Sequence, residues 1–536
     1  MKKLFHLIVL AGLIVTLGYA VYHFGTPSLA SGSSPLGMDM SDTLLSNTQD
    51  SSQFVDTVEA LDISSLKISI PWQEVELSAG LFTWTISPQG AQIDLTDLIH
   101  KLGQKDISVT LVLEGFPTYL QYEDLSEQNV VASYLDGWQR YVQAVVAQFG
   151  DTVDAWQIGI AINLPFELQE QPIAAAVLAS PSTYAERLKI ASTVIKAASS
   201  TDMVIIGGIV SDTGNCLNQP SAFLESLNSL EVWDEFDVIG IDLSTYASAP
   251  EGKYMYQTYD TVSGACLTSA EGGFNPAEII ALVDGVNNQY GQKPIWITDL
   301  TWSQADLSSA ASERGTLEDV VRADYLSRAT LMLLGSHHVE KIFWQYGNDN
   351  LQNSLGVFAQ QDFSNLTQAL KGFRSSANAS DALNGTYQYR LTTSGLVNIF
   401  VWRGYGGDSF QPYTLQNVSG YQLEAFSLDA DSIKNGQGID LPVSENGDTG
   451  FMLSERPVLV KATSTDLKER FSLYTQGVAS SAGNSLKKST SGFIDEQKDK
   501  ASQQVKDWVD EQKDSLFDAL KQSLLDWLKG AINLNS

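Results

Sequence analysis

The chain has 536 residues, of which 43% are hydrophobic, and a formal net charge of −31 at pH 7. This length is sufficient to bury a full core and is too long for one ordinary domain. The acidic excess excludes a basic face for nucleic acid and disfavours docking on anionic lipid through charge. We therefore expect one large domain with attachments and no nucleic-acid partner.

The first 30 residues predict export. Lys2 and Lys3 precede an apolar run over residues 4 to 24, a pattern typical of signal peptides that is also long enough to span a bilayer. Small residues at 18 to 20 and at 28 to 30 offer cleavage sites. A removed signal peptide and an uncleaved N-terminal membrane anchor both stay open, and both place the body outside the cytoplasm.

Strand-like and helix-like stretches alternate over residues 31 to 378, which predicts an α/β fold with parallel strands and crossover helices. The expected strands are Pro35 to Met40, Leu66 to Ile70, Ile107 to Leu113, Val153 to Ile162, Met203 to Val210, Phe236 to Leu243, Pro294 to Leu300 and Val339 to Tyr346. The expected helices include Tyr134 to Phe149, Thr183 to Ser199, Asn275 to Tyr290 and Leu317 to Leu334. Eight such units fit a (β/α)8 TIM barrel. An open doubly wound sheet is the alternative, but no glycine-rich phosphate loop supports it.

Six segments of this region resemble retaining glycoside hydrolases of the (β/α)8 superfamily that holds cellulases, xylosidases and iduronidases. They are Ile68 to Trp84, Trp156 to Pro165, Pro181 to Ser199, Asp237 to Ile241, Lys293 to Asp299, and Ile342 to Tyr346 with the Gly356 to Phe358 return. The fourth of these usually ends in His-x-Tyr in the family, and here Asp242 stands in place of the His. The resemblance covers about residues 35 to 375. It implies a sugar-cleaving barrel with no cofactor.

The two catalytic positions that the resemblance implies are both changed. The family's fourth strand ends in Trp-x-Ile-x-Asn-Glu-Pro, where the Glu is the acid/base, and here Ile160 and Ala161 stand at Asn and Glu. Sliding the match by three places puts Leu164 at the Glu position. The family's Lys-Pro-Ile-Trp-Ile-Thr-Glu segment carries the nucleophile, and its Glu has become Asp299.

Retaining hydrolysis needs two carboxyl groups about 5 to 5.5 Å apart, one attacking and one protonating the leaving oxygen. Alanine does neither, and loss of general acid catalysis forfeits about 10²- to 10⁴-fold in rate. The shorter Asp299 withdraws its carboxylate by one methylene, when a misplacement of about 1 Å already costs about 10²-fold. We therefore predict a catalytically impaired protein.

Other carboxylates keep an active enzyme open as an alternative. Glu114, Asp212 and Asp242 follow predicted strands and are expected, with Asp299, at the C-terminal mouth of the barrel. Asp299 paired with Glu114 or Glu167 as the acid is one such arrangement. For each acid taken singly, a solvated loop carboxylate is also consistent with the sequence.

Aromatic side chains near strand ends are candidates for stacking on sugar rings, beside Glu114 and Asp242 as hydroxyl partners. These aromatics are Trp72, Tyr119, Tyr246, Trp302, Trp344 and Tyr346. Ordinary core or loop packing is the alternative for each one.

The two cysteines, Cys216 and Cys266, are expected to form a disulfide in an exported protein, with two unpaired thiols as the alternative. No metal site is predicted, because the histidines beyond the leader, His100, His337 and His338, have no partner at ligand spacing.

Three attachments follow the barrel. Residues 379 to 465 alternate short β-rich runs with turns and predict a small β-sandwich. Residues 466 to 491 form a linker rich in Ser and Gly. Residues 492 to 536 have apolar side chains every three or four positions, which predicts an amphipathic helix. Self-association or a protein partner through residues 492 to 530 is favoured over binding to a membrane surface, because the segment lacks a lysine excess.

Three functions remain open at this stage. The first is an envelope-associated, impaired glycosidase-like protein that binds carbohydrate or serves as a structural platform. The second is an active glycosidase. The third is an assembly protein that works through its C-terminal helix. The barrel fold alone does not separate them.

Overall fold

The structure is a computed structural model that describes most residues from 34 to 465. The intervals within that range that it does not describe are 42–50, 88–91, 118, 121–125, 154, 165–179, 212–218, 245–248, 254–256, 261–264, 269–272, 336–338, 347–354, 374, 382–383, 393–395, 405–409 and 429–431. The predicted leader, the linker and the C-terminal helix lie outside the described residues. Among the helices that are described, none has the length and apolar character needed to cross a membrane.

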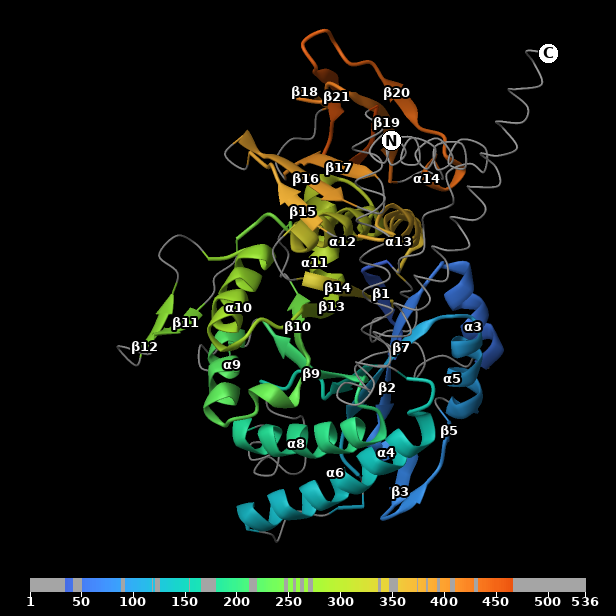
Figure 1. Cartoon of the computed structure of the whole chain (residues 1–536), viewed down its shortest axis with the longest axis vertical. Helices are drawn as coiled ribbons and strands as arrows, with labels where there is room; N and C mark the ends of the chain where they lie inside the picture. Colours follow the sequence, from blue (N-terminus) through green and yellow to red (C-terminus); the bar gives the residue numbers. More distant parts are fainter. Residues whose placement is uncertain are drawn as a thin grey trace, which may run out of the picture.

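The main body is a closed barrel of eight parallel strands, in the order β1-β14-β13-β10-β9-β8-β7-β2 (Figure 1). Its strands are β1 (Leu36–Asp39), β2 (Ser65–Pro71), β7 (Ser108–Glu114), β8 (Ala155–Ile158), β9 (Met203–Val210), β10 (Val238–Ser244), β13 (Ile295–Thr301) and β14 (Val339–Gln345). The predicted (β/α)8 fold is therefore confirmed.

Helices surround the barrel, because each crossover returns the chain to the start of the next strand. They are α3 (Ser51–Ala60), α5 (Leu95–Gln104), α6 (Glu127–Phe149), α8 (Pro181–Ala198), α9 (Pro220–Ser229), α10 (Pro276–Tyr290), α11 (Gln304–Arg314), α12 (Glu318–Gly335) and α13 (Val357–Ala369). Short elements decorate the loops: α4 (Trp72–Val75), the turn η3 (Trp233–Glu235), and the strand pairs β3 (Glu76–Ser78) with β4 (Leu81–Phe82), β5 (Thr85–Ile86) with β6 (Ile93–Asp94), and β11 (Gln257–Asp260) with β12 (Ala265–Thr268).

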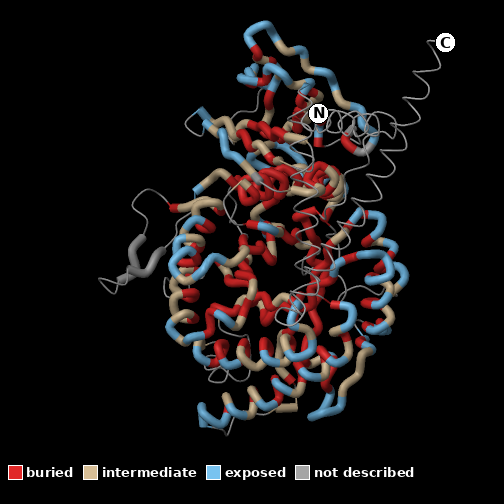
Figure 2. Tube along the Cα trace, viewed as in Figure 1, coloured by how far each residue is buried: buried red, intermediate tan, exposed pale blue. Residues whose placement is uncertain are grey.

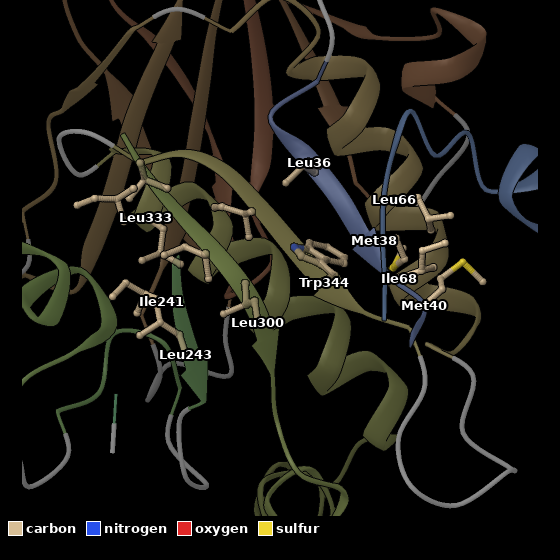
Figure 3. Packing of buried hydrophobic residues seen from close by; sticks show 14 of the residues in the cluster. Leu36, Met38, Met40, Leu66, Ile68, Ile241, Leu243, Leu300, Leu333 and Trp344 are labelled. Atoms are coloured by element: carbon tan, nitrogen blue, oxygen red, sulfur yellow. The ribbon is translucent and has the colours of Figure 1, made fainter. Parts of the chain in front are cut away.

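The strands bury both faces, as the trace coloured by burial shows (Figure 2). Side chains such as Leu66, Ile68 and Ile241 belong to the large cluster formed with the helices, part of which is drawn in Figure 3. Trp296 and Phe343 belong to a separate, smaller cluster inside the barrel. Because strand side chains alternate in direction, each strand contributes to both.

The fourth barrel strand is shorter than the sequence predicts. It was expected to reach Ile162 but ends at Ile158. Gly159 and Ala161 have φ of 87° and 47°, a left-handed conformation that a strand does not accommodate. The chain therefore turns just before the position of the lost acid/base.

A β-sandwich follows the barrel. One sheet has the order β15-β16-β17-β22-β19-β20, and a two-stranded sheet pairs β18 with β21. The strands are β15 (Ser375–Asn378), β16 (Thr386–Thr392), β17 (Val397–Arg403), β18 (Gln411–Leu415), β19 (Tyr421–Ser427), β20 (Ile439–Leu441), β21 (Thr449–Leu453) and β22 (Val458–Ser464), with the short helix α14 (Ser432–Asn435). The sheet thus begins at β15, a few residues before the expected boundary.

Alternation along β17 shows how the sandwich is attached. Ile399 and Val401 pack in the core between the two sheets. Phe400 and Trp402 point the other way and join the core of the barrel's helices. The larger sheet is therefore covered on one face by the smaller sheet and on the other by the helices of the barrel. The sandwich packs against α12 and α13 (Figure 1).

Candidate functional site

Polar side chains occupy the interior of the barrel above the cluster of Trp296 and Phe343. Asp39 on β1 and Lys67 on β2 are register partners. Their side chains form an ion pair of 2.8 Å between Nζ and Oδ2, with Lys67 2% exposed. A charged pair at this depth is unusual for a barrel core, which is normally filled by branched apolar side chains.

Asp242, on β10, is the second carboxylate of this group. It accepts a hydrogen bond of 2.6 Å from the Thr298 hydroxyl and another from the backbone N–H of Ala161. Burial raises the pKa of Asp242 above its ordinary value, although Lys67 and the Thr298 hydroxyl act in the opposite direction.

Asp299 reaches the same region because β13 is irregular. The pairing of β13 with β14 shifts between Ile297 and Leu300, and the pairing with β10 aligns Asp299 with Asp242. A bulge of this kind re-aims side chains. Strict alternation would send Thr298 and Asp299 to opposite faces, yet Thr298 bonds Asp242 and Asp299 acts electrostatically on Lys67.

Lys67 carries the one positive charge in the group that it forms with Asp39, Asp242 and Asp299. Burial acts against its charged form, but Asp39, Asp242 and Asp299 together raise the pKa of Lys67 above its ordinary value. Lys67 therefore stays protonated at neutral pH. It serves as a charge partner and is unsuited to act as a base or an amine nucleophile.

Between the end of the fourth strand and Leu164, the last residue described before the gap, no side chain carries a carboxylate. Ala161 presents a methyl group and turns its backbone N–H toward Asp242. Glu114 lies at the end of β7, which is opposite the strand of Asp299 in the closed barrel, because three strands separate them on either side. Its pairing with Asp299 stays a prediction. Glu167, the other expected acid, lies outside the described residues, as does Asp212.

The predicted aromatic contacts fall into two groups. Trp72 and Trp344 are completely buried, and Trp302 is 3% exposed. Trp72 packs among Tyr134, Trp138 and Tyr141, so its indole has no ring face left for a sugar.

The other two buried indoles are also packed on protein. Trp344 lies against Phe363 and donates to the Thr330 hydroxyl, while Trp302 packs on Tyr325. All three indoles are core residues, because burial of a large apolar ring is favourable. The packing alternative therefore holds for these three residues, and the predicted stacking on sugar rings does not.

The remaining predicted residues are less buried or not described. Tyr346 and Tyr119 are partly exposed, and burial raises the pKa of both phenols. Tyr246 and Cys216 lie outside the described residues. The side chain of Cys266, on β12, is not described either, so the disulfide stays a prediction.

Sequence reasoning missed Asp39 and Lys67. The signal was present in β2, where Leu66, Ile68 and Ile70 are apolar and Lys67 and Ser69 alternate with them. In a barrel strand, that alternation assigns the intervening polar residues to the interior. A lysine there demands a buried anion on a neighbouring strand.

Within the described residues, no group of three or more His, Cys, Asp or Glu side chains is arranged to hold a metal ion. The ammonium of Lys67 fills the place among the carboxylates that a cation would otherwise take. The site is therefore an array of acceptors around one fixed positive charge.

Solved structures of glycoside hydrolases align with this chain at low sequence identity. A family 39 glycoside hydrolase from the gut symbiont Bacteroides cellulosilyticus aligns with a TM-score of 0.57 and 14% identity, over 81% of this chain and 82% of that chain. A family 30 subfamily 8 xylanase from Clostridium acetobutylicum aligns with a TM-score of 0.47 and 11% identity, over 81% of this chain and 98% of that chain. No known protein family matches the sequence, and no curated protein does. The first likeness confirms a glycoside-hydrolase-like fold.

Proposed function

We propose that this protein is an exported, envelope-associated carbohydrate-binding protein built on a glycosidase barrel, with little or no hydrolytic activity. The observation that carries the proposal is Ala161 at the end of the fourth strand. A methyl group there supplies no proton to a leaving oxygen, and poor leaving groups such as sugars depend on that proton. Export rests on the leader sequence.

Carbohydrate binding is supported by two carboxylates, Asp242 and Asp299, that accept hydrogen bonds and remain although the acid/base glutamate is replaced by Ala161. Asp242 and Asp299 are partly exposed at the barrel's C-terminal end, where ligands of this fold bind. Carboxylates accept hydrogen bonds from sugar hydroxyls, and such charge-assisted bonds are about twice as strong as neutral ones.

A second candidate is hydrolysis by Asp299 with Asp242 as the acid. The register pairing of these residues and the raised pKa of Asp242 favour it. Against it, the Thr298 hydroxyl and the Ala161 N–H both donate to Asp242, and both bonds favour the ionised carboxylate. The two acids also stand on adjacent strands, which places them on one wall and not across a glycosidic bond.

The test is a panel of aryl glycosides and natural oligosaccharides with the purified protein. We expect traces of turnover with activated aryl glycosides, none with oligosaccharides, and little change in Asp299→Asn. Robust turnover that disappears in Asp299→Asn would establish an active enzyme instead, and its loss in Asp242→Asn as well would identify the acid. Ala161→Glu combined with Asp299→Glu asks whether the barrel regains weak hydrolysis.

A further inference from the structure

We propose that this protein carries N-linked glycans on three exposed asparagines of the sandwich, Asn378, Asn384 and Asn417. Export, which is part of the proposed function, is the premise, because acceptor sites of this kind are modified in secreted proteins. The positions of the acceptor motifs in the sequence and their exposure in the fold support the proposal.

The acceptor motif is confined to one stretch of the chain. Asparagines occur from residue 47 to residue 535, but an Asn followed two residues later by Ser or Thr, with no Pro between, occurs only within residues 365 to 419. These motifs begin at Asn365, Asn378, Asn384 and Asn417. The barrel sequence before residue 365 therefore offers no acceptor, and glycans on the later sites leave the barrel mouth uncovered.

The structure separates the four motifs by accessibility. Asn365 and Thr367 are fully buried on α13, and the Asn365 Nδ2 donates a hydrogen bond of 2.6 Å to the carbonyl of Leu428. A glycan on Asn365 would have to expel this side chain from the core. Asn378, Asn384 and Asn417 are exposed, so a glycan on each of them extends into solvent.

The local contacts of the exposed asparagines are compatible with modification. Asn378 accepts the backbone N–H of Ser380 at 2.9 Å through Oδ1, a bond that does not use Nδ2. The backbone of Asn417 is left-handed, with φ of 58°, and its N–H donates to Asp448 at 3.3 Å. Asn384 donates from Nδ2 to Asp381 at 2.6 Å. Losing that exposed hydrogen bond costs only about 0.5 to 1.5 kcal/mol.

The sites lie on an edge and in two connections of the sandwich. Asn378 is the last residue of β15, an edge strand of the six-stranded sheet. Asn384 lies between β15 and β16, and Asn417 lies between β18 and β19 (Figure 1). Such connections accept bulky attachments. An unprotected edge strand invites pairing with another chain, and a glycan at Asn378 obstructs it.

The modification is a group transfer that needs no oxidant or reductant. The sugar donor is an oligosaccharide joined through a phosphate ester to a lipid, and the catalyst is a transferase of the export pathway. The asparagine Nδ2 bonds to the anomeric carbon, the bond between that carbon and the phosphate oxygen breaks, and the nitrogen loses one proton. The phosphate leaves with the lipid.

The experiment is peptide mass spectrometry of the full-length protein, isolated from the cells that naturally produce it after those cells are fractionated. We expect added sugar mass on the peptides that carry Asn378, Asn384 and Asn417. We expect none on the peptide that carries Asn365, which is the internal control because it has the same motif in a buried position.

Two surface substitutions separate the motif from exposure alone. Ser419→Ala keeps Asn417 and removes its motif, so the Asn417 peptide should lose all of its sugar while Asn378 and Asn384 keep theirs. Asn446→Gln is the matched control, since Asn446 is exposed in the same sandwich and lies outside any motif. All three glycans should persist in Asn446→Gln. Both positions are exposed, where substitutions seldom impair folding.

Each other result overturns a defined part. Protein found outside the cytoplasm without sugar on any of the three asparagines overturns this inference and leaves export and carbohydrate binding intact. Protein retained in the cytoplasm overturns export together with this inference. Sugar on Asn365, or sugar on Asn417 that survives Ser419→Ala, overturns the assignment by motif and exposure. Sugar on only some of the three overturns the assignment for those that lack it.

Discussion

Gly208 makes room for Asp242 inside the barrel. A β-carbon built at Gly208 falls far inside van der Waals contact of both carboxylate oxygens. The Thr298 hydroxyl donates a hydrogen bond of 2.6 Å to Asp242. A methyl group at position 208 would therefore have to displace the Asp242 carboxylate or the backbone of β9.

Replacing Gly208→Ala should therefore destabilise the protein by about 1 to 3 kcal/mol, the usual cost of overpacking, and should weaken sugar binding. Thermal unfolding measures the first effect and calorimetric titration the second. Gly285→Ala is the matched control, because nothing lies within 4 Å of a β-carbon there, and in the middle of α10 it should stabilise by about 0.5 to 1 kcal/mol. Equal effects of both changes would show that Asp242 is not confined.

The ionisation of Asp242 should also make the stability of the protein depend on pH. Burial raises the pKa of Asp242, so the folded state keeps this proton at pH values where the unfolded chain has already lost it. The stabilisation is present below the ordinary aspartate pKa of about 4 and is lost as pH rises through the raised value.

Asp242→Asn removes that dependence. Relative to the unaltered protein, the thermal midpoint of the variant should therefore rise as pH is increased from about 4 upward. The absolute thermal midpoint of Asp242→Asn also reflects the loss of the carboxylate that accepts from Thr298. That loss shifts the midpoint by a similar amount at every pH and does not change the trend. A relative midpoint that falls with pH would contradict the direction of the pKa shift.

At the scale of elements, the turn after β8 decides where the fourth strand stops. Gly159 and Ala161 both have positive φ, which costs a residue other than glycine about 1 to 2 kcal/mol. The sequence Gly159-Ile160-Ala161-Ile162 looks like a continued strand, since Ile and Ala do not signal a turn. The boundary was therefore not predictable from local pattern.

Opposite substitutions in this turn should have opposite effects. Ala161→Gly relieves the strain and loses about 0.4 to 1 kcal/mol to the freer unfolded chain, so we expect a net gain of about 0.5 kcal/mol. Gly159→Ala should destabilise, because its φ is 87° and its β-carbon would lie 2.8 Å from Ile162 Cγ2. Thermal midpoints of the two variants test this, and destabilisation by Ala161→Gly would show that Ala161 is not strained.

The bulge in β13 decides on which face of the strand Asp299 lies, which the sequence did not predict. Lys293 to Asp299 predicted a strand with Asp299 at its end, and that is what forms. The alternation of Ile295, Trp296 and Ile297 does not say on which face Asp299 lies, because a bulge depends on pairing with neighbouring strands. Strand order and element type were accessible from periodicity, and the alternation along β2 marks Lys67 as an interior residue. The arrival of Asp299 in the same region was not accessible, because it depends on the irregular pairing of β13.

At the scale of the whole molecule, an ionic network joins the barrel to the sandwich. Arg314 contacts Asp324 at 3.2 Å and Glu455 at 2.5 Å. Arg456 contacts Asp324 at 2.9 Å and Asp362 at 2.5 Å. These residues come from α11, α12, α13 and the turn between β21 and β22, so no local pattern in the sequence predicts their meeting.

Burial makes this network costly to break. Asp362 is fully buried, Asp324 is 4% exposed and Arg456 is 16% exposed. Removing one partner of a buried pair leaves the other charge in a medium that solvates it poorly, at about 3 to 5 kcal/mol. The sandwich and the barrel should therefore unfold together, as one cooperative unit.

Arg456→Met keeps much of the arginine's apolar stem and removes its charge beside Asp324 and Asp362. We expect the thermal midpoint to fall by several degrees or more, with a free-energy loss of about 3 kcal/mol. Lys189→Met is the control, since its pair with Glu186 on α8 is 40% and 53% exposed and exposed pairs contribute about 0 to 1 kcal/mol. Differential scanning calorimetry measures both variants and reports whether one transition becomes two. A loss in Arg456→Met no larger than in Lys189→Met would mean that apolar packing of Phe400 and Trp402 alone holds the sandwich on the barrel.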